Sequence, residues 1–146
     1  MRSPRLLAAV ALAAAAPAFA ALGGAPNPPP PQAPPATVQQ ATTATGAAFT
    51  HVERQLDTGT VVHEFVDASG VVFAVSWSGP FLPDLRELLG ASFPALQDSA
   101  ARGHTSALSI SRPDLVLVSA GHMRAFQGRA WLPTRLPAGF DPRLIP

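Results

Sequence analysis

The sequence has 146 residues, a length that fits one domain. It contains no cysteine, which excludes disulfide bonds, thiol catalysis, thiolate metal sites and lipid attachment through an N-terminal cysteine. Ten basic residues stand against nine acidic ones, so the chain lacks the strongly basic field on which binding to nucleic-acid phosphates depends.

Residues 1–20 have the organisation of an export signal. Arg2 and Arg5 supply the positive end, Leu6 to Ala16 form an apolar run, and Ala18-Phe19-Ala20 matches the small-x-small cleavage pattern. The apolar run is too short to cross about 30 Å of hydrocarbon, so no membrane anchor is expected after cleavage behind Ala20. The pattern predicts a periplasmic or secreted protein.

Residues 21–48 contain seven prolines and no charged residue. Such a composition offers little apolar surface to bury, so the segment is predicted to be a flexible Pro/Ala-rich linker. A docking site for a proline-recognising partner is the alternative interpretation.

Three strands are predicted next, over residues 49–56, 60–66 and 71–77. They are rich in β-branched and aromatic residues, and the turn-forming sequences "DTG" and "DASG" separate them. If Val66 faces Val71, one sheet face gathers the core, and Glu64 is the one polar residue on it, near an edge. That core face comprises Val62, Val66, Val71, Phe73, Val75 and Trp77.

Helices are predicted over residues 84–90 and 94–102, the first of them begun by Pro83-Asp84 and ended by Gly90. Strands follow over 106–112 and 114–120, and residues 121–131 form the last hairpin. The order of these elements predicts an α+β domain over residues 49–140, with a C-terminal tail over 141–146. We expect a small antiparallel sheet of about six strands, with one or two short helices inserted between two strand groups.

The stretch "GHMRAFQGRAW" holds the candidate ligand-binding residues. With Gln127-Gly128 as a two-residue hairpin loop, strand alternation places one histidine, two arginines and two aromatic residues on a single face. Rings that stack and guanidinium groups that grip carboxylate or phosphate suit an anionic or carbohydrate-like ligand. These residues are His122, Arg124, Phe126, Arg129 and Trp131.

A structural role for the same face is the alternative. The helix "PDLRELLG" would then cover the aromatic residues, and Asp84 or Glu87 would pair with Arg124 or Arg129.

Signals for catalysis and for metal binding are weak. His51, His63, His104 and His122 show no ligand spacing, and with a three-residue "DTG" loop His63 faces Glu53 as an ordinary cross-strand pair. The chain has no GxSxG motif, although a serine, His122 and Asp84 or Asp114 could be assembled into a triad. No catalytic residue, metal ligand or cofactor is therefore assigned.

Several blocks together resemble a known family. "ALGG" after the signal, "GTVVHEFVDASGVVFAVSWSGPFLPDLRELLG" and "RPDLVLVSAGHMRAFQGRAWLP" are similar to a family of exported proteobacterial proteins with a domain of unknown function, the DUF2844-like proteins. The resemblance covers most of the chain after the signal. It implies an exported bacterial protein and supplies no catalytic residues, substrate or cofactor.

The leading hypothesis is a non-enzymatic binding or envelope-associated module. Its partner would be an anionic or carbohydrate-like envelope ligand, or another envelope protein. The alternatives are a small hydrolase with an unmarked His/acid site, and a structural partner whose exposed sheet edge pairs with another chain.

Overall fold

The computed structural model describes residues 22–26, 28, 33–100 and 107–146. The predicted export signal, residues 1–20, lies outside the described residues. Among the residues described, no helix is both long enough and apolar enough to span a membrane.

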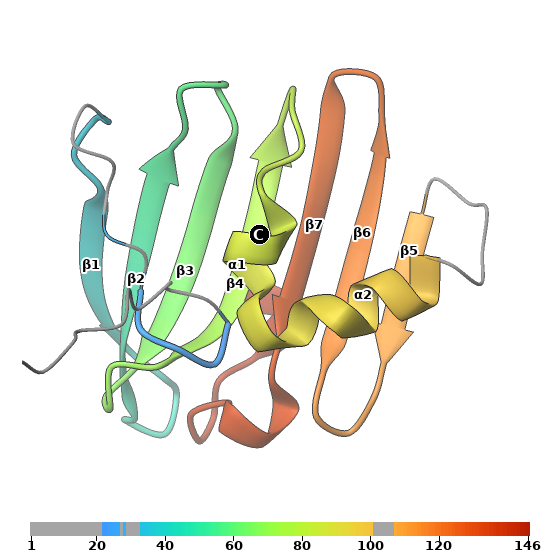
Figure 1. Cartoon of the computed structure of the whole chain (residues 1–146). Coiled ribbons are helices and arrows are strands. Elements are labelled where there is room, and N and C mark those ends of the chain that lie inside the picture. Colours follow the sequence, from blue (N-terminus) through green and yellow to red (C-terminus); the bar gives the residue numbers. More distant parts are fainter. Residues whose placement is uncertain (1–21, 27, 29–32, 101–106) are drawn as a thin grey trace, which may run out of the picture.

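A single antiparallel sheet dominates the fold (Figure 1), in the order β1-β2-β3-β4-β7-β6-β5. Between β4 and β5 the chain forms two short helices, α1 (Leu85–Leu89) and α2 (Phe93–Ala100), which lie across one face of the sheet. The predicted α+β class is confirmed, with one more strand than expected. The seven strands are β1 (Thr37–Thr42), β2 (Ala48–Gln55), β3 (Val61–Asp67), β4 (Val72–Gly79), β5 (Ala107–Ser111), β6 (Val116–His122) and β7 (Ala125–Trp131).

The additional strand and an N-terminal anchor both lie in the segment expected to be a flexible linker. Strand β1 pairs with β2 along its whole length. Leu22 is only 2% exposed in the core beneath the helices, and its N–H donates to Leu88 O. Gly23 N–H donates to Val72 O, and Val72 N–H donates to Gly24 O, each at 2.8 Å. Backbone hydrogen bonds and one buried leucine therefore order parts of this segment, although its composition predicts a flexible linker.

The two faces of the sheet bury two separate apolar clusters. The cluster on the helix-covered face includes Val75, Trp77, Leu89 and Leu117. Asp84 begins α1 by accepting hydrogen bonds from Arg86 N and Glu87 N, which orients the buried leucines of α1 toward the sheet. This face is the main core of the domain.

The opposite face, which we call the C-terminal face, is covered in part by the end of the chain. Phe140 and Ile145 pack there against Phe65 and Phe73, and the rings of Phe73 and Phe140 meet edge to face with centroids 4.9 Å apart. The segment expected to be a C-terminal tail, 141–146, is thus part of the domain, because Ile145 is only 1% exposed.

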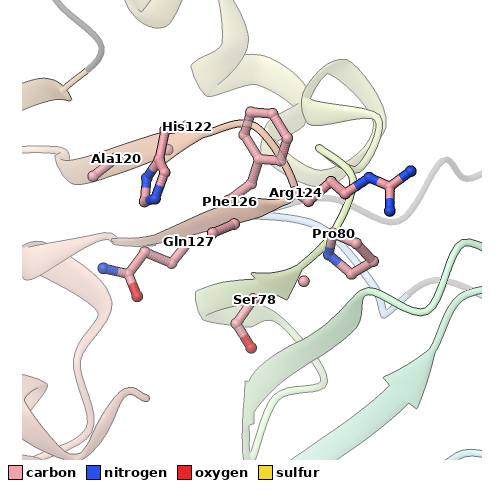
Figure 2. A pocket seen from close by; sticks show the side chains of 10 residues that line it. Ser78, Pro80, Ala120, His122, Arg124, Phe126 and Gln127 are labelled. Atoms are coloured by element: carbon pink, nitrogen blue, oxygen red, sulfur yellow. The ribbon is translucent and has the colours of Figure 1, made fainter.

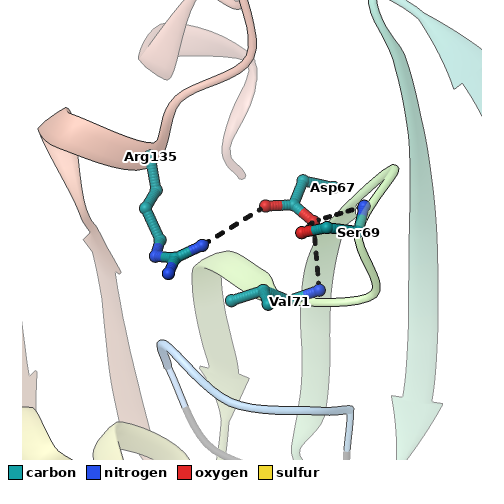
Figure 3. Close-up of polar contacts among 4 residues, drawn as sticks. All are labelled: Asp67, Ser69, Val71 and Arg135. Carbon is teal, nitrogen blue, oxygen red and sulfur yellow. Dashed lines mark hydrogen bonds and ion pairs between the residues drawn. The ribbon is translucent and has the colours of Figure 1, made fainter.

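A polar cluster ties the C-terminal segment to the β3–β4 turn (Figure 3). Asp67 Oδ1 accepts from Ser69 N and Val71 N, and Arg135 Nη1 lies 3.8 Å from Asp67 Oδ2. Burial raises the pKa of Asp67, but the hydrogen bonds from Ser69 and Val71 and the charge of Arg135 outweigh it, and the pKa is lowered overall. The ionised carboxylate therefore holds the turn and the C-terminal segment together.

An irregularity between Phe65 and Val66 changes the register of β3 with β4. Val66 pairs with Val72 rather than with Val71, and Phe73 belongs to the C-terminal face, so its predicted place on the helix-covered face is wrong. Glu64, expected near an edge, is 1% exposed and accepts a hydrogen bond from Arg54 Nη2 at 2.7 Å.

The contact between Trp77 and Gly128 sets the register of β4 with β7. These two residues are cross-strand partners, and a Cβ built on Gly128 would overlap the Trp77 indole. Gly128 is therefore a glycine inside a strand that makes room for a ring. The prediction that Gln127-Gly128 forms a hairpin loop is wrong, because its glycine was interpreted as a turn residue.

On the C-terminal face, two histidines form a hydrogen-bonded pair. His51 Nε2 lies 3.0 Å from His63 Nδ1, and the His51 ring stacks on Phe65. His63 faces Glu53 across the strands, as the three-residue loop predicted. Burial lowers the pKa of both histidines, His63 lowers that of His51 further, and Glu53 opposes the shift in each.

The anchor predicts that Leu22→Ala lowers the free energy of unfolding by about 2–5 kcal/mol, because a buried leucine leaves a cavity when it is truncated. Chemical denaturation measures the change. Leu144→Ala is the control, since Leu144 is largely exposed and its truncation should cost within about 0.5 kcal/mol. Equal stability of the two variants would contradict the anchor.

The Trp77 contact predicts that Gly128→Ala destabilises the protein by about 1–3 kcal/mol through overpacking. In a Trp77→Leu background, Gly128→Ala should lower the free energy of unfolding clearly less, because the ring that the new methyl group would overlap is absent. A double-mutant cycle of unfolding free energies measures this coupling, and strict additivity would count against the contact.

The histidine pair predicts that stability falls as the pH drops through about 6.5. Because the folded pKa values lie below the unfolded value, the unfolded chain binds more protons there, and the free energy of unfolding decreases toward acid. Denaturation at about pH 7.5 and about pH 5.5 measures the slope. His51→Gln with His63→Gln should flatten it, whereas His122→Gln, which changes an exposed histidine, should leave it as in the wild type.

Candidate functional site

The turn between β6 and β7 is two residues long and lies at Met123-Arg124. His122 pairs with Ala125 at the base of this turn. Arg124 has φ 65°, and it is the only residue other than glycine with a positive φ in the described part of the chain. The left-handed region costs an L-residue roughly 1–2 kcal/mol, which a glycine there would avoid. Because an arginine occupies this turn position, the sequence contains no glycine there from which the turn could have been predicted.

The true turn divides the predicted binding residues between the two faces. Alternation from the observed register places His122, Arg129 and Trp131 on the C-terminal face and Phe126 on the helix-covered face. Figure 2 shows the Phe126 ring directed away from His122 and Gln127, with Arg124 projecting from the turn. The prediction of one common face for all five residues is wrong, because it depended on a loop at Gly128.

Two adjacent hollows nevertheless bring four of the five predicted residues to one region. The first, of about 450 Å³, lies at the end of the sheet beside the β6–β7 turn, and the second, of about 280 Å³, continues along the C-terminal face. They share Ser78, Ala120 and Gln127, one residue from each of three neighbouring strands. We call the two hollows together the β4–β7–β6 groove. His122, Arg124 and Phe126 line the first hollow, and Arg129, Val118 and Pro146 line the second.

Two arginines carry the positive charge in the lining of the groove. Arg124 and Arg129 line it together with His122, and no Asp or Glu is among its described lining residues. Ser78 and Gln127 add a hydroxyl and a carboxamide, which both donate and accept hydrogen bonds.

Arg129 is held in position by two contacts. Its Nη1 donates to Ile145 O at 3.2 Å, and its guanidinium carbon lies 5.9 Å from the centre of the Trp131 ring. This contact joins two residues of one strand and is not one of the cross-strand contacts that a loop at Gln127-Gly128 implied, in which Arg129 faced Phe126 and Arg124 faced Trp131. A guanidinium has five N–H donors, and the bond to Ile145 uses one of them.

The helices do not cover the predicted residues in the way that the alternative interpretation required. Trp131 packs with Phe65, Phe73 and the C-terminal segment rather than beneath α1. The side chain of Asp84 caps α1, and none of the ion pairs found among the described residues joins Asp84 or Glu87 to an arginine of the hairpin.

The residues suggested for a hydrolase or a metal site are not brought together. Asp114 precedes β6 and His122 ends it, so the two lie at opposite ends of that strand. No group of three histidine or acidic side chains that could hold a metal ion occurs within residues 22–26, 28, 33–100 and 107–146. His104 lies outside those residues.

Ser78, Gln127 and Pro146 were not identified from the sequence. Ser78 and Gln127 are cross-strand partners, although β4 and β7 lie far apart in the chain. Pro146 reaches the groove because the C-terminal segment folds back over the sheet. The sequence of β4 indicated that Ser78 lies near the end of a strand. It did not indicate that β7, and with it Gln127, lies beside β4.

Comparison with protein families identifies the group to which this sequence belongs. Residues 18–145 match the family described as "Protein of unknown function (DUF2844)". Comparisons with curated proteins and with solved structures gave no significant match. The match extends over most of the chain and includes the N-terminal anchor, all seven strands and every residue of the groove except Pro146, and the chain therefore belongs to the DUF2844 family.

Proposed function

We propose that this protein is an exported, non-enzymatic binding module of the bacterial envelope, and that its β4–β7–β6 groove holds an anionic, carbohydrate-like ligand. The observation that carries the proposal is the lining of the groove, which has two arginines and a histidine and no Asp or Glu side chain among its described residues. A carboxylate or phosphate placed beside Arg124 or Arg129 would gain charge-assisted hydrogen bonds from the guanidinium groups.

The shape of the groove favours an extended ligand. Its two hollows share residues from β4, β6 and β7, so a chain-like molecule could occupy both. The hydroxyl of Ser78 and the carboxamide of Gln127, in the shared part, suit the many hydroxyl groups of a sugar.

The conformation of Arg124 supports a role for its side chain. Backbone strain is retained where the surrounding structure or the function requires it, and a glycine would fill this turn position without cost. An arginine at the rim of a positive hollow supplies a long cationic side chain that a glycine lacks.

Arg129 supports the proposal in a different way. Its contacts with Ile145 and Trp131 restrain the guanidinium before any ligand arrives, which reduces the entropy lost on binding. A restrained arginine on the floor and an exposed one at the rim together offer two guanidinium groups to an anion.

The envelope location rests on residues 1–20. Their basic start, apolar run and Ala18-Phe19-Ala20 ending are typical of an export signal.

Arg124→Gly tests the function because it separates binding from stability. The free energy of unfolding should stay unchanged or rise by up to about 1 kcal/mol, since the left-handed strain is relieved. Affinity for an acidic oligosaccharide such as oligogalacturonate, measured by titration calorimetry, should fall on the order of tenfold, since one charge-assisted contact is lost.

Arg112→Ala is the matched control. It removes the same charge from an exposed position in the β5–β6 turn, at the other end of β6 from His122. Its affinity for the acidic oligosaccharide should equal that of the wild type. Neutral dextran should bind neither the wild type nor Arg112→Ala. Wild-type binding by Arg124→Gly, or no binding of the acidic oligosaccharide by the unaltered protein, would show the proposal to be wrong.

A further inference from the structure

Strand β1 forms one outer edge of the sheet. It pairs with β2 on one side, and five of its six residues are exposed. The exposed residues include Val38, an apolar side chain that is 60% accessible to solvent. A strand in this position presents a row of backbone groups that can pair with a further strand.

The hydrogen-bonding pattern identifies which residues of β1 face outward. Thr43 N–H donates to Ala47 O, so the odd-numbered residues of β1 direct their backbone groups toward β2. The bond from Leu56 N–H to Thr60 O gives the same result independently, since it assigns the even-numbered residues of β2 to β3 and leaves its odd-numbered residues for β1. The backbone N–H and C=O groups of Val38, Gln40 and Thr42 therefore point away from the sheet.

The residues of β1 lack the charges, the proline and the bulge by which many proteins prevent strand pairing. The sequence of β1, TVQQAT, has no charge and no proline, and its register with β2 is regular. Natural edge strands are usually blocked by lysine, by proline or by a bulge. An edge strand without such features indicates that pairing of β1 with a strand of another molecule is compatible with this protein or part of its function.

Strand directions decide between the possible pairings of two copies. Six successive antiparallel steps separate β1 from β5, so the two edge strands run in the same direction. Two copies joined in line, β5 to β1, would make a parallel pair. A two-fold axis beside β1 gives an antiparallel β1–β1 pair, which is the more stable arrangement and closes the assembly as a dimer.

The sequence of β1 is compatible with itself in this arrangement. With the two-fold axis at Gln40, Gln40 faces Gln40 of the second copy, and Val38 faces Thr42 of the second copy on both sides of the axis. The pairs are uncharged, and the exposed Val38 gains a β-branched neighbour.

We propose that two copies of this chain associate through antiparallel pairing of their β1 strands, centred on Gln40, to form one continuous sheet. The inference goes beyond the binding function of the groove, which lies on β4, β7 and β6, so either can fail without the other. An interface of one strand is small, and the dimer is therefore concentration-dependent.

Gln40→Pro tests the backbone pairing. Proline removes the outward N–H at the axis and is tolerated where that N–H faces solvent. Sedimentation equilibrium of the purified protein should show a monomer–dimer equilibrium for the wild type and for the control Gln40→Ala, which keeps the N–H. Gln40→Pro should be monomeric, with a circular dichroism spectrum and a melting temperature close to those of the wild type.

A charge exchange at the same position tests the two-fold axis without proline. Gln40→Glu and Gln40→Lys each place like charges opposite each other, and each should raise the dimer Kd on the order of tenfold. A mixture of the two variants should form a heterodimer, because the opposed charges then attract. A monomeric wild type at all concentrations, or variants that dimerise as the wild type does and gain nothing on mixing, would overturn the proposal.

Discussion

The indole of Trp77 rests against the bare backbone of Gly128, and the arrangement of the sheet follows from this contact. The ring is 2% exposed, between β7 beneath it and the leucines of α1 above it. Because an indole fits only opposite a residue without a side chain, β4 and β7 can pair in one register. That register places Ser78 beside Gln127 and Ser76 beside Arg129. The contact of Trp77 with Gly128 on the helix-covered face thus determines which residues form the floor of the groove on the opposite face.

Much of the architecture could be predicted from local patterns. The turn sequences "DTG" and "DASG" located the β2–β3 and β3–β4 hairpins, and the Asp84 cap located α1, because their chemistry is contained in a few adjacent residues. The pairing of His63 with Glu53 followed from loop length alone. Strand β1 was missed because a run of Thr, Gln and Ala beside prolines has no apolar alternation, and β2 supplies the order that its own sequence lacks.

The candidate site was harder to predict because a glycine has two uses. Gly128 could provide either a positive φ for a turn or space for a ring, and the sequence does not distinguish them. The ring belongs to Trp77, some fifty positions earlier, and only the pairing of β4 with β7 brings the two together. Arg124, which takes the left-handed conformation, carried no turn signal at all. The charged residues of the hairpin were therefore found, but their distribution over the two faces was not.

The N-terminal anchor and the start of the C-terminal segment are hydrogen-bonded to neighbouring residues of β4. The N-terminal anchor bonds to Val72, and the segment leading to Ile145 begins where Leu132 N–H donates to Phe73 O. A mechanical pull applied through both segments would first load these two attachments. The load would peel away the short attachments one after the other and leave the strands beyond them in register.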